Sequence, residues 1–173
     1  MKLSDIKPIP EYYDRYVRLV ADVELSEAFD QSIRQLDEVD RSLLRRLGGR
    51  TYAPGKWTAK DIIQHLADVE RIMAYRTLMF ARGDKTAPAG FDQDLLVASA
   101  RANAKTVDEL IDDLKTVRAA TTSLFDSFDD ETLLNTGTNW KYEISVLAMG
   151  FTLAGHQIHH LKIIEEKYHP LIG

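Results

Sequence analysis

The sequence has 173 residues, of which 45% are hydrophobic and 28% charged, as expected for one globular domain over residues 1–173. It contains no cysteine, which excludes disulfides, thiolate metal sites and a cysteine nucleophile. The formal net charge of −5 argues against nucleic-acid binding, because phosphates are neutralised by a surplus of Lys and Arg. The N-terminal segment is charged and proline-containing, and no apolar run could cross a membrane. We therefore expect a cytoplasmic protein.

The first half of the chain contains signals for three helices. A short helix is expected at about residues 11–20. The first main helix is expected at about residues 24–47, where apolar residues recur three or four apart and Gly48 and Gly49 follow as a stop. The second is expected at about residues 58–81, because Thr58 and Asp61 form a capping-box pattern.

The second half begins with a long connection, over about residues 83–106, in which Asp92 could cap a short helix. The third main helix begins at Thr106, with Glu109 three residues later. The fourth, at about residues 143–167, is apolar on most of its circumference and should be the most buried. No segment alternates as a half-buried strand does. The sequence therefore predicts an all-α fold, a four-helix bundle with a long connection between helices two and three.

Three histidines fall on apolar helix faces. His156 and His160 are four residues apart, so they stand one above the other on the fourth helix, and His65 lies on the apolar side of the second. Three imidazoles around a divalent ion would leave one position open for water, whose pKa the ion lowers toward neutrality. The alternative is that these are core histidines hydrogen-bonded to backbone or carboxylate groups, and spacing alone leaves both interpretations open.

Two neighbours of the histidine pair limit the chemistry. A metalloprotease helix needs Glu directly after the first histidine as general base, whereas Gln157 stands there and cannot accept the proton. This disfavours a zinc protease. His159 is the competitor for the ligand role, but its position around the helix makes it a poorer partner for a shared ion than His156 and His160 are for each other.

Three segments carry a family resemblance. Residues 57–76 read WTAKDIIQHLADVERIMAYR, residues 87–94 read APAGFDQD, and residues 144–168 read ISVLAMGFTLAGHQIHHLKIIEEKY. Their motifs and their order resemble the DinB-like (DinB/YfiT-like) superfamily of metal-dependent enzymes. The match spans most of the chain.

The resemblance implies a four-helix bundle, often a homodimer, with a divalent metal held by His65, His156 and His160. It implies that His159 is not a ligand and lies behind the ligands. The metal in such proteins is zinc, nickel or manganese, and three imidazoles suit iron as well. Characterised members include transferases and isomerases that use a low-molecular-weight thiol.

Two aspartates flank His65 on the same side of its helix. Asp61 lies four residues before it and Asp68 three after, so either carboxylate could orient an imidazole or stay solvated. In the long connection, Asp92 and Asp94 could supply a general base, although Asp92 is better explained as a helix cap.

Five further residues are candidates for the same site. Trp57 and Phe91 could wall an apolar pocket, but aromatic residues at loop ends more often plug a core. Arg76 is expected on the surface, although the resemblance also places an arginine there. No role is assigned from the sequence to Asn139 and Trp140.

The leading hypothesis is an enzyme that uses a divalent metal (Zn, Ni, Mn or Fe) to activate water for hydrolysis or a small thiol for transfer to a small-molecule substrate. Because the chain lacks cysteine, any such thiol must arrive as a cosubstrate. The alternative is a non-catalytic helical module in which the metal is structural or the site binds a small ligand. Neither nucleic acid nor a membrane is an expected partner.

Overall fold

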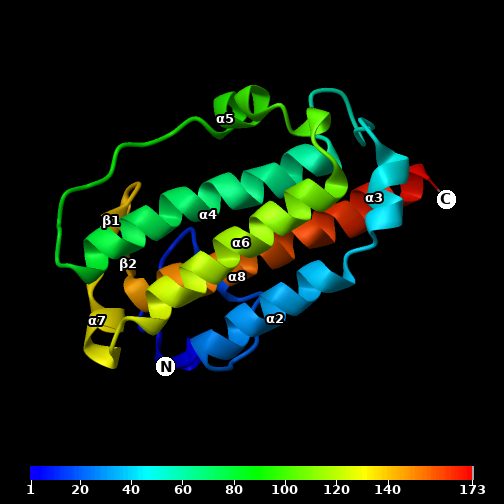
Figure 1. Ribbon diagram of the computed structural model, residues 1–173. Helices are drawn as coiled ribbons and strands as arrows, with labels where there is room; N and C mark the ends of the chain where they lie inside the picture. Colours follow the sequence, from blue (N-terminus) through cyan, green and yellow to red (C-terminus); the bar gives the residue numbers. More distant parts are fainter. Residues whose placement is uncertain (173) are drawn as a thin grey trace.

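Four long helices pack side by side along most of their length in the computed structural model, which describes residues 1–172 (Figure 1). They are α2 (Leu25–Glu38), α4 (Ala59–Ala81), α6 (Val107–Asp126) and α8 (Val146–Ile163). Helices α4 and α2 each pack against both α6 and α8. The mostly helical fold is therefore confirmed. Among the described residues, no helix has the length and apolar character needed to span a membrane.

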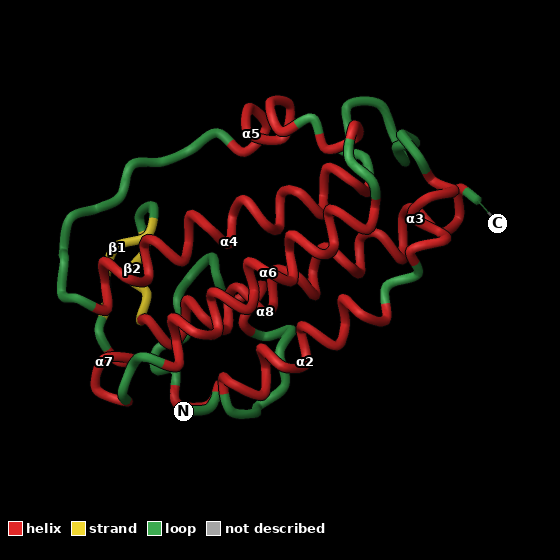
Figure 2. Tube along the Cα trace, in the orientation of Figure 1, coloured by secondary structure: helices red, strands yellow, loops and turns green. Residues whose placement is uncertain are grey.

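Shorter elements connect and close the bundle, and Figure 2 distinguishes them from the loops. The short α-helices are α1 (Asp14–Val17), α3 (Arg41–Leu47), α5 (Gln93–Ala100) and α7 (Asp130–Leu134). Single turns of 3₁₀ helix occur at Leu3–Asp5, Ala102–Ala104 and His169–Leu171, and a π-helical turn, Ile164–Tyr168, continues α8.

The two capping boxes expected from the sequence are present. The Thr58 hydroxyl accepts a hydrogen bond from the Asp61 backbone N–H at 3.1 Å, and the Asp61 carboxylate accepts one from the Thr58 N–H at 2.9 Å. Thr106 and Glu109 make the same reciprocal pair at the start of α6. Each pair satisfies two backbone donors that the first helical turn leaves without partners.

The first main helix is interrupted, so the prediction of one helix over residues 24–47 was wrong. Val39 leaves the helical conformation with ψ 127°, and Asp40 starts a new helix by accepting a hydrogen bond from the Leu43 N–H at 2.9 Å. Apolar spacing continues across the break because Leu36, Leu43 and Leu47 all face the same core. Periodicity alone therefore could not reveal the interruption.

The prediction that the chain forms no strand was also wrong. Strands β1 (Thr136–Asn139) and β2 (Tyr142–Ser145) pair antiparallel, with Thr136 opposite Ser145 and Asn139 opposite Tyr142. Strands of four residues are too short to show a reliable alternating pattern. The hairpin also delays the start of α8 to Val146, where the Ser145 hydroxyl caps the helix.

Two glycines permit close packing around the hairpin and α8. A Cβ on Gly137 would lie 2.1 Å from the Phe80 ring, and a Cβ on Gly155 would lie 2.0 Å from the backbone oxygen of Tyr16. Glycine at position 155 therefore lets the segment around α1 lie directly on α8. This contact places Tyr16 beside His156, with 5.2 Å between the ring centroids.

The connection from α4 to α6 runs back along α4 and carries α5, which packs on that helix (Figure 1). Asp92 caps α5 by accepting hydrogen bonds from the backbone N–H groups of Asp94 and Leu95. The residues just before α5 lie over the bundle and line a cavity described below.

Candidate metal centre

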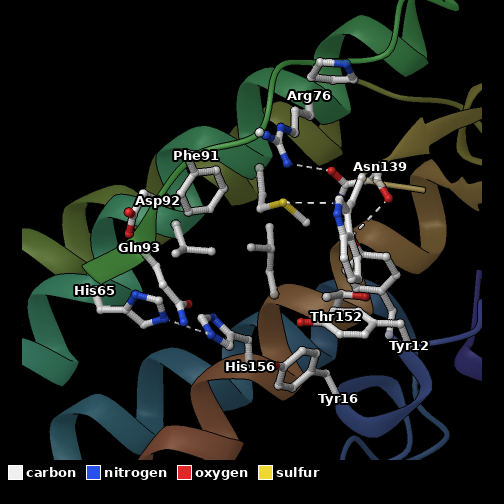
Figure 3. A pocket seen from close by; sticks show the side chains of 17 residues that line it. Tyr12, Tyr16, His65, Arg76, Phe91, Asp92, Gln93, Asn139, Thr152 and His156 are labelled. Atoms are coloured by element: carbon white, nitrogen blue, oxygen red, sulfur yellow. Dashed lines mark hydrogen bonds between the residues drawn. The ribbon is translucent and has the colours of Figure 1, made fainter. Parts of the chain in front are cut away.

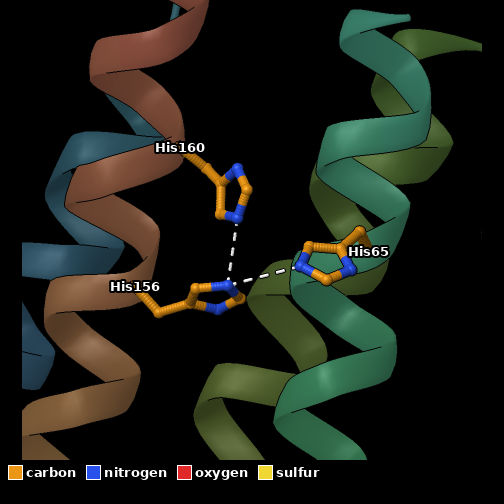
Figure 4. A group of neighbouring side chains, drawn as sticks. All are labelled: His65, His156 and His160. Carbon is orange, nitrogen blue, oxygen red and sulfur yellow. Dashed lines mark hydrogen bonds between the residues drawn. The ribbon is translucent and has the colours of Figure 1, made fainter. Parts of the chain in front are cut away.

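The imidazoles of His65, His156 and His160 converge between α4 and α8 (Figure 4). His65 lies in the second turn of α4, and the other two lie one turn apart on α8. The Nε2 atom of His156 is 3.3 Å from that of His65 and 3.0 Å from that of His160. The three residues that the sequence selected are therefore neighbours in space.

Burial keeps these histidines neutral. Their side chains are only 4%, 8% and 9% exposed in chain order. Burial lowers the pKa of His65 to about 4 and that of His160 to about 3, and it also lowers the pKa of His156 well below its usual range. Neutral imidazoles keep a nitrogen lone pair at pH 7, which is the form that binds a metal ion.

The three Nε2 atoms are better placed to bind one cation than to hydrogen-bond with one another. Nitrogen ligands about 2.0–2.1 Å from a tetrahedral ion lie roughly 3.3 Å apart, close to the spacings found here. The single proton or lone pair on His156 Nε2 cannot satisfy two imidazole nitrogens at once. Among the described residues, His160 Nδ1 also has no hydrogen-bond partner. A cation bound by the three Nε2 atoms would remove the unsatisfied contacts between them.

A cavity of about 510 Å³ adjoins this cluster and is lined by His65 and His156 (Figure 3). Its other walls combine aromatic, aliphatic and polar side chains from α1 and the residues just before it, α4, α8, the hairpin, and the connection that leads into α5. The remaining lining residues are Tyr12, Tyr13, Tyr16, Val69, Met73, Arg76, Pro88, Gly90, Phe91, Asp92, Gln93, Asn139, Trp140, Thr152 and Leu153. A ligand in this cavity can therefore reach two of the three imidazoles.

Trp57 and Asp94 form a polar contact beside His65. The indole N–H of Trp57 donates a hydrogen bond to the Asp94 carboxylate at 3.2 Å. The Trp57 ring packs on the His65 imidazole, with 4.7 Å between centroids. The negative charge of Asp94 partly opposes the effect of burial on the pKa of His65. Trp57 thus packs on the proposed ligand His65, while Phe91 lines the cavity.

Among the described residues, the hydrogen bonds of Asp61 and Asp68 go to groups other than the imidazoles, so neither carboxylate orients a proposed ligand. Asp61 accepts hydrogen bonds from Thr58 and from the Asn103 side chain at the start of α4. Asp68 accepts one from Gln64 and faces Arg71. Asp92 lines the cavity while capping α5. His159 packs edge-on against His160 and Tyr16.

Comparison with known protein families identifies the family of this chain. The model of the DinB superfamily matches residues 15–164. The chain belongs to the DinB superfamily. A search of curated protein sequences gave no match.

Two solved structures share the fold of this DinB-superfamily protein. YfiT from Bacillus subtilis, described as a probable metal-dependent hydrolase with an unusual four-helix bundle topology, is 18% identical, with a TM-score of 0.69 over 96% of this chain and 90% of its own. The mycothiol-dependent maleylpyruvate isomerase is 13% identical, with a TM-score of 0.62 over 93% of this chain and 62% of its own. At these identities the likeness establishes the fold.

Arg76 corrects an expectation drawn from the sequence, because it is buried in this DinB-superfamily protein and not on the surface. Its guanidinium donates hydrogen bonds to the Asn139 side-chain oxygen and to the Ala89 carbonyl oxygen, both at 2.7 Å. Asn139 is 1% exposed, at the end of β1. The two residues are 63 positions apart, so no local pattern could have paired them.

The tyrosines around α1 are cavity residues that were not predicted from the sequence. Tyr12, Tyr13 and Tyr16 line the cavity, and Tyr12 packs edge-on against Trp140 at 5.2 Å between centroids. Tyr12 and Trp140 both have positive φ, 70° and 59°, which is strained for aromatic residues. Such strain concentrates at functional sites. The run of tyrosines in residues 12–16 was the one available signal.

Proposed function

We propose that the protein is a metal-dependent enzyme in which His65, His156 and His160 hold one divalent ion through their Nε2 atoms. The observation that carries the proposal is the convergence of the three nitrogens at the wall of the cavity. An ion held by three imidazoles lowers the pKa of a water or thiol that completes its coordination, and so supplies a nucleophile near neutral pH. Zinc, nickel, manganese and iron are all compatible with this ligand set.

The chain supplies the surroundings that such a reaction needs. Val69, Met73 and Leu153 give the cavity apolar walls, which limit the access of competing water. Asp92 is the proposed proton acceptor, since it lines the cavity and only its Oδ1 is used in capping α5. Asp94 is proposed to hold Trp57 against His65, which fixes the orientation of that imidazole.

The nucleophile is either water or a low-molecular-weight thiol. A hydrolytic reaction is supported by the likeness to YfiT, and a thiol-dependent transfer by the likeness to the mycothiol-dependent isomerase. The chain has no cysteine, so the thiol in the second case is a cosubstrate.

Turnover measurements test the proposal. Ester and amide hydrolysis and thiol transfer to electrophilic acceptors would be assayed with metal-loaded protein, with chelator-treated protein, and after metal is added back. We expect activity to disappear with the metal and to return with it, and His156→Ala to be inactive under loading conditions. Full activity without metal would refute the proposal.

A non-catalytic module is the second candidate, in which the metal joins α4 and α8 or the cavity binds a ligand without reacting. A closed structural site normally has four protein ligands, whereas the described residues provide a group of three. Metal removal distinguishes the two. A large fall in melting temperature without any turnover in the loaded protein would favour the structural role.

We also propose that the protein forms a homodimer and is located in the cytoplasm. Exposed Tyr75 and Leu78 lie three residues apart on one face of α4 and offer an apolar surface for a second copy. Light scattering of the purified protein tests the dimer, which a monomeric mass at micromolar concentration would exclude.

A further inference from the structure

Arg76 is a buried cation that has no acidic partner in the described part of the chain. Its side chain is 6% exposed, and no carboxylate of the described residues lies within ion-pair distance. The buried arginine elsewhere in the bundle is different, because Arg118 is paired with Glu70 at 2.8 Å. An unpaired buried charge is costly, so its retention needs an explanation.

The guanidinium of Arg76 has donors to spare. It carries five N–H groups. Among the described residues it donates two hydrogen bonds, one to the Asn139 side-chain oxygen and one to the Ala89 carbonyl oxygen. Both acceptors are neutral. The Phe91 ring, 5.3 Å away, adds a cation–π contact and faces the same cavity. The polar surroundings therefore hold the guanidinium in place and leave its charge uncompensated.

Arg76 and the histidine cluster line the same cavity at a distance from one another. His65, Val69, Met73 and Arg76 lie three or four residues apart and form one stripe along α4. Arg76 lies eleven positions after His65 on α4, which is about 16 Å along the helix axis. Figure 3 shows Arg76 and Asn139 on the side of the cavity away from His65 and His156, with apolar side chains between them.

We propose that Arg76 binds a carboxylate of the substrate, so that this protein acts on molecules with an anionic end, an apolar middle and a reactive group that reaches His65 and His156. The inference deepens the proposed function and rests on it, because it takes the cavity to be the substrate site. Asn139 is a positioning residue, since its side-chain oxygen orients the guanidinium.

A carboxylate fits better than a phosphate. Arg76 is the single Lys or Arg among the described residues that line the cavity, and Asp92, which lines it too, carries a negative charge. One guanidinium matches the single charge and the two oxygens of a carboxylate. A phosphate monoester, with nearly two charges, would call for further cationic groups.

The test compares two probes of the same shape and different charge. Binding of 4-phenylbutyrate and of its neutral amide, 4-phenylbutyramide, would be measured by calorimetry at pH 7.5 and low salt. We expect the carboxylate to bind about tenfold to a hundredfold more tightly than the amide, the range for a charge-assisted hydrogen-bonded pair. Equal binding of the two probes, or no binding of the carboxylate, would overturn the inference.

Three variants assign the preference to Arg76. Asn139→Asp is nearly isosteric and gives Arg76 an internal carboxylate, so the preference for the charged probe should vanish without loss of the fold. Arg76→Gln should abolish it as well. In His156→Ala the preference should persist, because that residue lies at the other end of the cavity. If the preference survives in folded Asn139→Asp protein, the carboxylate binds elsewhere and the inference fails.

The same samples separate this inference from the proposed function. Metal content is measured on each protein alongside binding. If the wild type binds no metal but prefers the carboxylate through Arg76, the metal-enzyme proposal fails and the carboxylate site stands. If the wild type holds metal that His156→Ala loses, but the wild type binds both probes equally, the metal-enzyme proposal stands and the carboxylate site fails. If His156→Ala removes the preference and Asn139→Asp does not, the probe binds the metal instead of Arg76.

Discussion

The buried histidine cluster makes the metal-free protein sensitive to mild acid. The unfolded chain has histidine pKa values of about 6.5. Burial lowers the pKa of folded His65 to about 4 and that of His160 to about 3, and it lowers that of His156 well below its usual range. Between these limits the unfolded state binds more protons than the folded state. Stability therefore falls as pH drops below about 6.5 and is fully retained above it.

The size of this effect follows from the three pKa differences. Between pH 7 and pH 5.5, each histidine that stays neutral in the folded state lowers the free energy of unfolding by about 1.2 kcal/mol, so the three together lower it by about 4 kcal/mol. His159, whose pKa burial also lowers, acts in the same direction. For a chain of this length, about 4 kcal/mol corresponds to a fall in melting temperature of roughly 8–16 °C.

Urea unfolding followed by far-ultraviolet circular dichroism measures the effect, with a chelator present to keep the metal out. The interval from pH 7 to pH 8 is the internal control, because the folded histidines stay neutral there and the unfolded ones are at most about a quarter protonated. His65→Gln removes one titrating group and should reduce the loss between pH 7 and 5.5 by about a third. An unfolding free energy that stays level or rises over that interval would refute the reasoning.

Three further perturbations probe the fold and the metal. Gly155→Ala should lower the free energy of unfolding by about 2 kcal/mol or more, because the new Cβ would meet the Tyr16 backbone. The control Gly49→Ala has open space around it and should change that free energy by no more than about 0.5 kcal/mol in urea titrations. Equal effects of the two substitutions would contradict the packing of Gly155 on Tyr16. Arg118→Met should cost about 3–5 kcal/mol because it leaves buried Glu70 unpaired, and a neutral result would show that Glu70 finds another partner. Free zinc at 100 times its dissociation constant should add about 2.7 kcal/mol to the unfolding free energy of the wild type, measured by thermal melting. The same zinc concentration should leave the unfolding free energy of the His156→Ala protein nearly unchanged.

The histidine cluster could be predicted because its determinants are local and periodic. The interval of four between His156 and His160 places both on one face of any helix, and the apolar pattern around His65 turns it toward the core. Capping boxes at Thr58 and Thr106 likewise depend on residues three apart. Such features survive in a single sequence without knowledge of the tertiary fold.

The remainder of the site could not be predicted because it depends on contacts between distant segments. Arg76 looked like a surface residue, and only its approach to Asn139 across the hairpin buries it. The hairpin itself has strands of four residues, and the break at Val39 leaves the apolar spacing intact. Each of these features is decided by tertiary packing, which overrides a weak local signal.

Metal content measured by elemental analysis on untagged protein tests the central claim most directly, with His65→Ala, His156→Ala and His160→Ala alongside the wild type. We expect close to one divalent ion per chain in the wild type and a large loss in each of the three variants, with all four proteins folded by circular dichroism. Wild-type protein that holds no metal after reconstitution, or variants that retain it in full, would contradict a metal centre formed by these three histidines.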